Sequence, residues 1–194
     1  PMNHRERVQT ALAHEVPDRC PMQVSFTPEF ARRLQHIYPT TKTLHNPHGG
    51  GNTYELERAL DEDMLLTSVG WANSYYASDE DTYVDEWQVE FRNVRYQTKF
   101  GIGHYTEMVG HPLAEDDAID SYRPPDPNRP ELYTEAEWMI DQFQKDYWIV
   151  GVTVTTMFET AWALRGYEKT LMDLVLDHDY VKKLFEIPFA YHHT

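Results

Sequence analysis

Residues 148–186 carry the strongest structural signal in the chain. They begin with a short apolar and β-branched run, 148–154, which is typical of a strand buried on both faces. A less regular segment follows to Trp162, and apolar residues then recur at nearly helical spacing up to Glu186. Strand, loop and helix in this order form the repeating unit of an α/β barrel, whose chemistry lies at the carboxyl ends of its strands. The sequence therefore predicts an α/β fold of the (β/α)8 TIM-barrel type.

Earlier segments fit further copies of this unit. Two strand candidates, Cys20–Phe26 and Asp63–Val69, precede the one at 148–154. Residues 83–109 alternate apolar and polar side chains, which predicts a half-exposed antiparallel β-hairpin inserted into the α/β chain. A capping box of Thr134 and Glu137 predicts a helix that opens there.

The number of units is too small for a closed barrel. About three β/α units are recognisable in 194 residues, whereas a barrel needs eight and typically about 250 residues. We therefore expect one domain, 1–194, that is the N-terminal part of a longer barrel. The alternative is a shortened relative that covers its open edges by oligomerising, for example as a homodimer.

Composition excludes several classes of function. The formal net charge of −15 argues against nucleic acid and anionic membrane as partners. No apolar run approaches the roughly 20 residues that span a bilayer. The single cysteine, Cys20, excludes an internal disulfide framework and favours a reducing compartment. We expect a cytoplasmic protein.

Several segments together resemble the uroporphyrinogen decarboxylase-like superfamily. The resemblance extends over nearly the whole length of the chain. The segments are Asn3–Val8, His14–Pro21, Asp85–Phe91, Gly103–Tyr105, His111–Leu113 and Phe158–Asp173. The resemblance implies a (β/α)8 barrel of which the C-terminal half would be missing here.

The superfamily contains two chemistries. One of them is favoured because this chain lacks the residues that the other requires. The decarboxylases grip the propionates of a tetrapyrrole with arginines after the first strand, where this chain has Met22–Phe26. Their second strand ends in a catalytic Asp, where this chain has Thr67–Trp71, and a tyrosine of their third motif is Trp162 here. We therefore expect a methyltransferase that moves a methyl group from a small methylated substrate to a corrinoid. A porphyrin-type decarboxylase and an incomplete, non-catalytic barrel fragment remain the alternatives.

The same resemblance implies the cofactors and partners. Cobalamin would be carried by a partner corrinoid protein, and the small methylated compound would be the substrate. Zinc is compatible with this branch, with ligands expected outside this chain.

The predicted strand ends supply the candidate site residues. An apolar, aromatic pocket with a few polar anchors would suit a methylated small molecule; ordinary core packing is the competing interpretation of each residue. The substrate-binding candidates are Gln23, Ser25, Trp71, Asn73, Met157, Phe158 and Trp162.

Two residues of the predicted insertion are candidates for proton transfer. His104 and Glu107 could close over the substrate and handle a proton, while a solvent-facing strand is the simpler interpretation. Arg165 is a candidate anion anchor, although exposed arginines are common. The sequence contains no Walker loop, Rossmann fingerprint, Gly-x-Ser-x-Gly elbow or His-Glu-x-x-His motif.

Overall fold

The computed structural model describes residues 1–38, 53–68, 75, 77–78, 80–99, 101–153 and 156–194, which form a mixed α/β protein. The chain divides into two compact units. The first comprises Pro1–Val69, Lys99–Gly103 and Pro130–Val152, and the second comprises Gly70–Thr98, His104–Arg129 and Thr153–Thr194.

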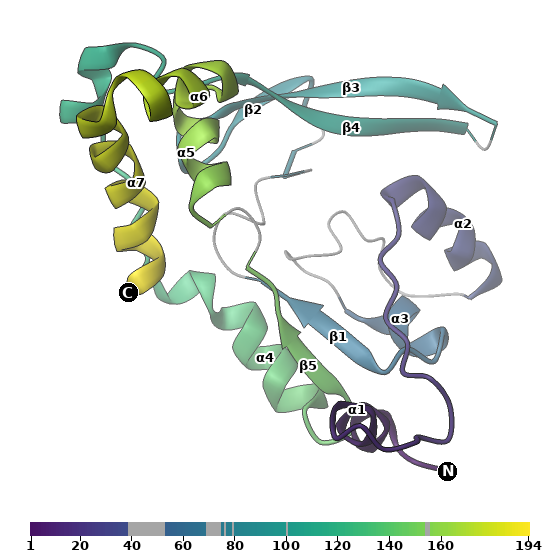
Figure 1. Cartoon of the computed structure of the whole chain (residues 1–194). Coiled ribbons are helices and arrows are strands. Elements are labelled where there is room, and N and C mark those ends of the chain that lie inside the picture. Colours follow the sequence, from purple (N-terminus) through teal and green to yellow (C-terminus); the bar gives the residue numbers. More distant parts are fainter. Residues whose placement is uncertain (39–52, 69–74, 76, 79, 100, 154–155) are drawn as a thin grey trace. The chain divides into compact units, whose positions relative to one another are not determined.

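The first unit is built around two parallel strands, β1 (Met64–Thr67) and β5 (Trp148–Gly151), shown in Figure 1. Their register places Met64 opposite Trp148 and Thr67 opposite Gly151. Parallel neighbours require a crossover connection, and helix α4 (Thr134–Phe143) precedes β5 within it and contacts β1. The strands predicted at 63–69 and 148–154 are therefore confirmed in position, and they form one β-α-β unit.

The core of the first unit lies between β1 and α4. Tyr54, Leu65 and Met139 are fully buried together, and Phe143, Tyr147 and Ile149 pack against them. Helices α1 (His4–Leu12), α2 (Pro28–Ile37) and α3 (Glu55–Ala59) complete the unit. Helix α1 begins with a capping box in which Asn3 Oδ1 accepts from the Glu6 amide at 2.7 Å.

The strand predicted at Cys20–Phe26 is wrong, because this segment forms no strand and joins neither described sheet. The physical reason lies in its amides. Pro21 has no N–H, the Met22 amide donates to a side-chain oxygen of Asp63, and the Val24 amide donates to a side-chain oxygen of Glu62. Carboxylates thus take donors that a strand ladder would need.

Most of a three-stranded sheet in the order β2-β3-β4 belongs to the second unit, and the first residues of β4, 101–103, belong to the first. The strands are β2 (Thr82–Val84), β3 (Glu90–Thr98) and β4 (Gly101–Gly110), and β2 runs antiparallel to β3. This sheet occupies the region in which the sequence predicts a β insertion at 83–109. The buried side chains of Trp87, Val89 and Phe91 belong to this region.

Three consecutive helices follow in the second unit: α5 (Phe158–Arg165), α6 (Tyr167–Leu176) and α7 (His178–His193), drawn from green to yellow in Figure 1. The expectation of a loop up to Trp162 is therefore wrong from Phe158 onward, because α5 begins at that residue. Gly166, with φ of +95°, separates α5 from α6. Asp177 caps α7 by accepting from the Tyr180 amide at 3.0 Å.

Two further expectations need correction. The predicted capping box of Thr134 and Glu137 is wrong, because Tyr133 is the N-cap of α4 and the Thr134 hydroxyl donates to the Pro130 carbonyl at 3.3 Å. Within the described residues the sheets have two and three strands and form no closed barrel. The coarse class, mixed α/β, is confirmed. None of the helices in the described ranges has the length and apolar content needed to cross a bilayer.

Candidate functional site

A small pocket in the first unit brings together two of the predicted substrate-binding residues. Met64 and Leu66, which alternate along β1, line it with the segment 23–26 and three residues around α3: Tyr54, Glu57 and Glu62. Gln23 Nε2 donates to Ser25 Oγ at 3.1 Å. The internal volume is about 10 Å³, which holds at most about one water molecule. In this conformation the pocket is therefore closed to a substrate.

Glu62 is the fully buried carboxyl group of this pocket, and no pattern in the sequence marks it as a candidate. Its side chain is fully buried, and its Oε2 accepts from the Val24 amide at 3.2 Å. Its Oε1 has no hydrogen-bond partner among the described residues. Burial raises the pKa of Glu62 to about 7, with the charges of Glu57 and Asp63 adding to the effect and the Val24 hydrogen bond opposing it. A carboxyl that titrates near neutrality can give or take a proton.

Tyr54 forms a fixed wall of the pocket. Its hydroxyl donates to the carbonyl oxygen of Leu66 at 2.9 Å, and burial raises the pKa of the phenol. Its backbone φ of +55° is unusual for a tyrosine. The hydrogen bond and the burial together hold this conformation at the start of α3, so the aromatic ring is a positioned part of the core.

Next to the pocket, Asp63 organises a buried ion cluster. Its carboxylate accepts from Arg7 Nη1 and Arg19 Nη1, each at 2.5 Å, and from the Met22 amide at 2.8 Å, and it contacts His4 Nδ1 at 3.0 Å. Burial by itself would raise the pKa of Asp63, but these hydrogen bonds outweigh it and lower the pKa. Every bond joins the N-terminal segment to the start of β1, so the cluster is structural. The sequence signal was available: an Asp directly before a buried strand.

The predicted aromatic residues lie in the second unit and form a cluster of their own. Met157 is the N-cap of α5, and Phe158 and Trp162 lie one helical turn apart on it. The Tyr167 ring meets both of them edge-on, at centroid distances of 6.4 and 5.9 Å. Two other predicted residues, Trp71 and Asn73, lie outside the described residues.

The predicted proton-transfer residues are on β4 of the second unit. Glu107 accepts from Arg92 Nη2 at 2.7 Å, in a pair whose side chains are 42% and 54% exposed. The Glu107 carboxylate is thus engaged in a surface ion pair. His104 is half-buried on the same strand. Their assignment to catalysis stays a prediction.

The guanidinium of Arg165, the predicted anion anchor, is already paired with other groups of the protein. It donates to the carbonyl oxygens of Leu113 and Ala114 and to the carboxylates of Asp116 and Asp173. The ring of Tyr180 lies 4.3 Å from the guanidinium carbon. Arg165 therefore joins α5 to α6, α7 and the segment after His111.

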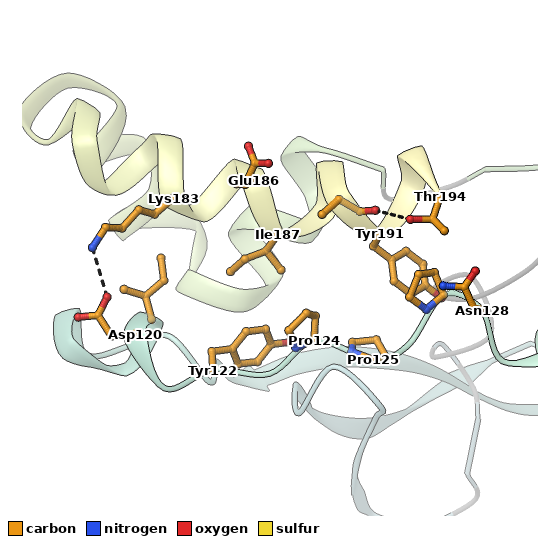
Figure 2. Close-up of a pocket in the computed structure, with 13 residues that line it drawn as sticks. Asp120, Tyr122, Pro124, Pro125, Asn128, Lys183, Glu186, Ile187, Tyr191 and Thr194 are labelled. Atoms are coloured by element: carbon orange, nitrogen blue, oxygen red, sulfur yellow. Dashed lines mark hydrogen bonds and ion pairs between the residues drawn. The ribbon is translucent and has the colours of Figure 1, made fainter.

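A larger groove in the second unit lies between α7 and the proline-rich segment before it (Figure 2). Its volume is about 710 Å³. Figure 2 shows Lys183 paired with Asp120 at one end, and at the other end the Thr194 hydroxyl donates to the carbonyl oxygen of Ala190. Tyr122, Ile187 and several prolines make the lining mainly apolar. The proline-rich segment carries no local sequence pattern that predicts a groove.

The described residues contain no group of three or more His, Cys, Asp or Glu side chains that could hold a metal ion. Comparison with protein-family models, with curated proteins and with solved structures finds no match.

Proposed function

We propose that this chain is the N-terminal part of a methyltransferase-like enzyme of the uroporphyrinogen decarboxylase superfamily. It would transfer a methyl group from a small methylated substrate to a corrinoid carried by a partner protein. The sequence resemblance motivates the proposal, and the β1-α4-β5 unit is compatible with part of a barrel.

One observation carries the choice of a neutral substrate over a polyanionic one. Arg7 and Arg19 bind the carboxylates of Asp63, Asp18 and Asp61, and Arg165 binds Asp116 and Asp173. These guanidinium groups are engaged in structural ion pairs. The pocket beside β1 is lined by no arginine or lysine among the described residues; besides the carboxyl groups of Glu57 and Glu62, its polar side chains include Gln23 and Ser25, which suit an ether or alcohol oxygen.

The residues of this chain would bind and orient the methyl donor and protect it from water. When bound, the corrinoid would supply a nucleophilic cobalt that accepts the methyl group. The oxygen that loses the methyl group must take up a proton, because an unprotonated alkoxide leaves poorly. A nearby acid with a pKa near neutrality meets this need, and burial raises the pKa of Glu62 to about 7.

The test is ligand binding by the full chain. Saturation-transfer NMR with a panel of methyl ethers, and with uroporphyrin as the polyanionic competitor, should show binding of at least one ether and none of the porphyrin. Gln23→Ala should weaken ether binding roughly 10-fold, the value of one hydrogen bond of about 1.5 kcal/mol. Gln142→Ala, which removes an exposed glutamine from α4, should leave binding unchanged.

Two results would contradict the proposal. Binding of uroporphyrin with no binding of any methyl ether would favour the decarboxylase. Equal effects of Gln23→Ala and Gln142→Ala would remove the segment 23–26 from the site.

A further inference from the structure

The segment Gln23–Phe26 is held to β1 by few interactions. Its Val24 side chain is exposed, and its described hydrogen bond to the rest of the unit is the one from the Val24 amide to Glu62 Oε2. Upstream, Met22 is fixed by two bonds to Asp63 at 2.8 Å each. Beyond Met22, the described hydrogen bonding of the segment to the rest of the unit therefore depends on a single carboxyl group, while the Phe26 ring contacts Phe30 of α2 at a centroid distance of 5.5 Å.

That carboxyl lies where its charged form is poorly stabilised. Glu62 is 1% exposed, and within the described residues only one of its two oxygens accepts a hydrogen bond. The pocket beside it holds at most about one water. A buried carboxylate needs several donors or a cation, and without them it either takes a proton or moves into water.

We propose that Glu62 controls, through its protonation state, whether Gln23–Phe26 stays attached to β1. With the carboxyl neutral, the segment is closed over the pocket as observed. When the carboxyl ionises, it gains free energy by reaching water, and the segment that covers it is released. Because Gln23 and Ser25 lie on this segment, release would open the small pocket in which they meet.

The charged and titratable groups around Glu62 either oppose its ionisation inside the closed pocket or are paired with other groups. Glu57 on α3 and Asp63 before β1 add negative charge that opposes ionisation of Glu62. Arg7 and Arg19 are near in sequence to the segment, but both bind Asp63. The Tyr54 hydroxyl donates a hydrogen bond to the Leu66 carbonyl oxygen and offers no positive charge. The inference concerns this chain alone and does not rest on the proposed methyl transfer.

The experiment is hydrogen exchange of the full chain between pH 5 and pH 8, at constant ionic strength. Protection factors, which correct for the pH dependence of intrinsic exchange, are followed for the peptide that contains Val24. A shift of the Glu62 pKa from 4.5 in the open form to about 7 in the closed form predicts a fall in protection of roughly 70-fold over this range. The fall should level off above pH 7.

Two variants make the result specific. Glu62→Gln keeps an oxygen that can accept from the Val24 amide and cannot ionise, so its protection should stay constant within about twofold. Glu137→Gln removes the same charge from an exposed position on α4 and should behave like the unmodified chain. Unchanged protection in the unmodified chain, or the same fall in Glu62→Gln, would overturn the proposal.

A measurement on the unmodified chain covers the case in which Glu62→Gln does not fold. The Val24 amide resonance should shift with a midpoint near pH 7, matching the titration of the Glu62 carboxyl carbon. A Val24 resonance that does not change between pH 5 and pH 8 would equally contradict the inference.

Discussion

Glu62 and Asp63 are consecutive, fully buried carboxyl groups whose environments shift their pKa values in opposite directions. Asp63 accepts from two guanidiniums and the Met22 amide, with His4 also in contact, so its charged form is favoured. Glu62 accepts from one backbone amide, so its neutral form is favoured. The difference follows from what each side chain reaches: Asp63 contacts the arginines of the N-terminal segment, whereas Glu62 faces the small pocket.

The first prediction is that the stability of the first unit declines as the pH rises from about 4.5 to 7. In the folded state Glu62 has a raised pKa, so its contribution is complete below the unfolded value of 4.5 and is lost as the pH passes about 7. The loss is on the order of 3 kcal/mol, at about 1.4 kcal/mol for each pKa unit. Urea unfolding of Glu62→Gln, which lacks this titration, should gain on the unmodified chain by this amount between pH 4.5 and pH 8. Parallel curves for the two proteins would show that Glu62 is ionised at no cost.

The second prediction concerns Asp63→Asn. The substitution keeps the shape but leaves Arg7, whose side chain is 8% exposed, without its buried negative partner. Breaking a buried pair in this way costs roughly 3–5 kcal/mol at pH 7. Because the folded-state pKa of Asp63 is lowered, its contribution is present above the ordinary value of 3.8 and is lost as the pH falls through the lowered one.

Unfolding of Asp63→Asn and the unmodified chain at pH 7 and pH 2.5 would test this. The two stabilities should differ at pH 7 and approach each other in acid. Asp61→Asn is the matched control, since Asp61 also pairs with Arg19 but is 71% exposed, and such surface pairs contribute about 0–1 kcal/mol. A large effect of Asp61→Asn would mean that the arginines, and not the burial of Asp63, determine the cost.

The sequence predicted those parts of the fold that depend on local patterns. Strands β1 and β5 follow from short apolar runs. The segment Cys20–Phe26 was missed because its amides bind side chains of Glu62 and Asp63, about 40 residues away. No local pattern reports such a distant acceptor.

The candidate site was predicted only in part, for a similar reason. Gln23 and Ser25 do line a common pocket. Glu62 was overlooked because a glutamate next to an aspartate normally indicates a solvated turn, and its burial becomes visible only with the tertiary structure. Arg165 was interpreted as a free cation, whereas the carbonyls and carboxylates that occupy it come from segments about 50 residues earlier and 8 residues later.

The third prediction is that Arg165→Lys destabilises the second unit despite conserving the charge. Arg165 uses Nε, Nη1 and Nη2 to reach Asp173, Leu113 and Asp116 at 2.8, 3.0 and 2.6 Å. A lysine ammonium is a single point and cannot reach all three partners. Leaving buried acceptors without donors should cost about 2–3 kcal/mol, measured as a shift in the urea midpoint of α5 and α7 peptides by hydrogen exchange.

A control separates geometry from charge at this position. Asp116 is 84% exposed, so Asp116→Asn should cost less than about 1 kcal/mol. If Arg165→Lys were as mild as Asp116→Asn, the buried contact of Arg165 with the Leu113 carbonyl would contribute nothing measurable.

The fourth prediction is that Gly166→Ala weakens the junction between α5 and α6. Gly166 has φ of +95° and ψ of 139°, a conformation that side chains with a Cβ rarely adopt. A Cβ at this position would also lie 3.4 Å from the His111 ring, whose Nδ1 is 2.7 Å from the Ala163 carbonyl oxygen. The backbone strain alone should cost about 1–3 kcal/mol.

Gly151→Ala is the matched control, because no heavy atom lies within 4 Å of a Cβ there and its φ is not positive; it should change stability by less than about 1 kcal/mol. Thermal unfolding of both variants, with exchange of the α5 and α6 amides, distinguishes the cases. Equal stability of the two variants would mean that the junction relaxes, and that α5 and α6 can continue as one helix when the glycine is replaced.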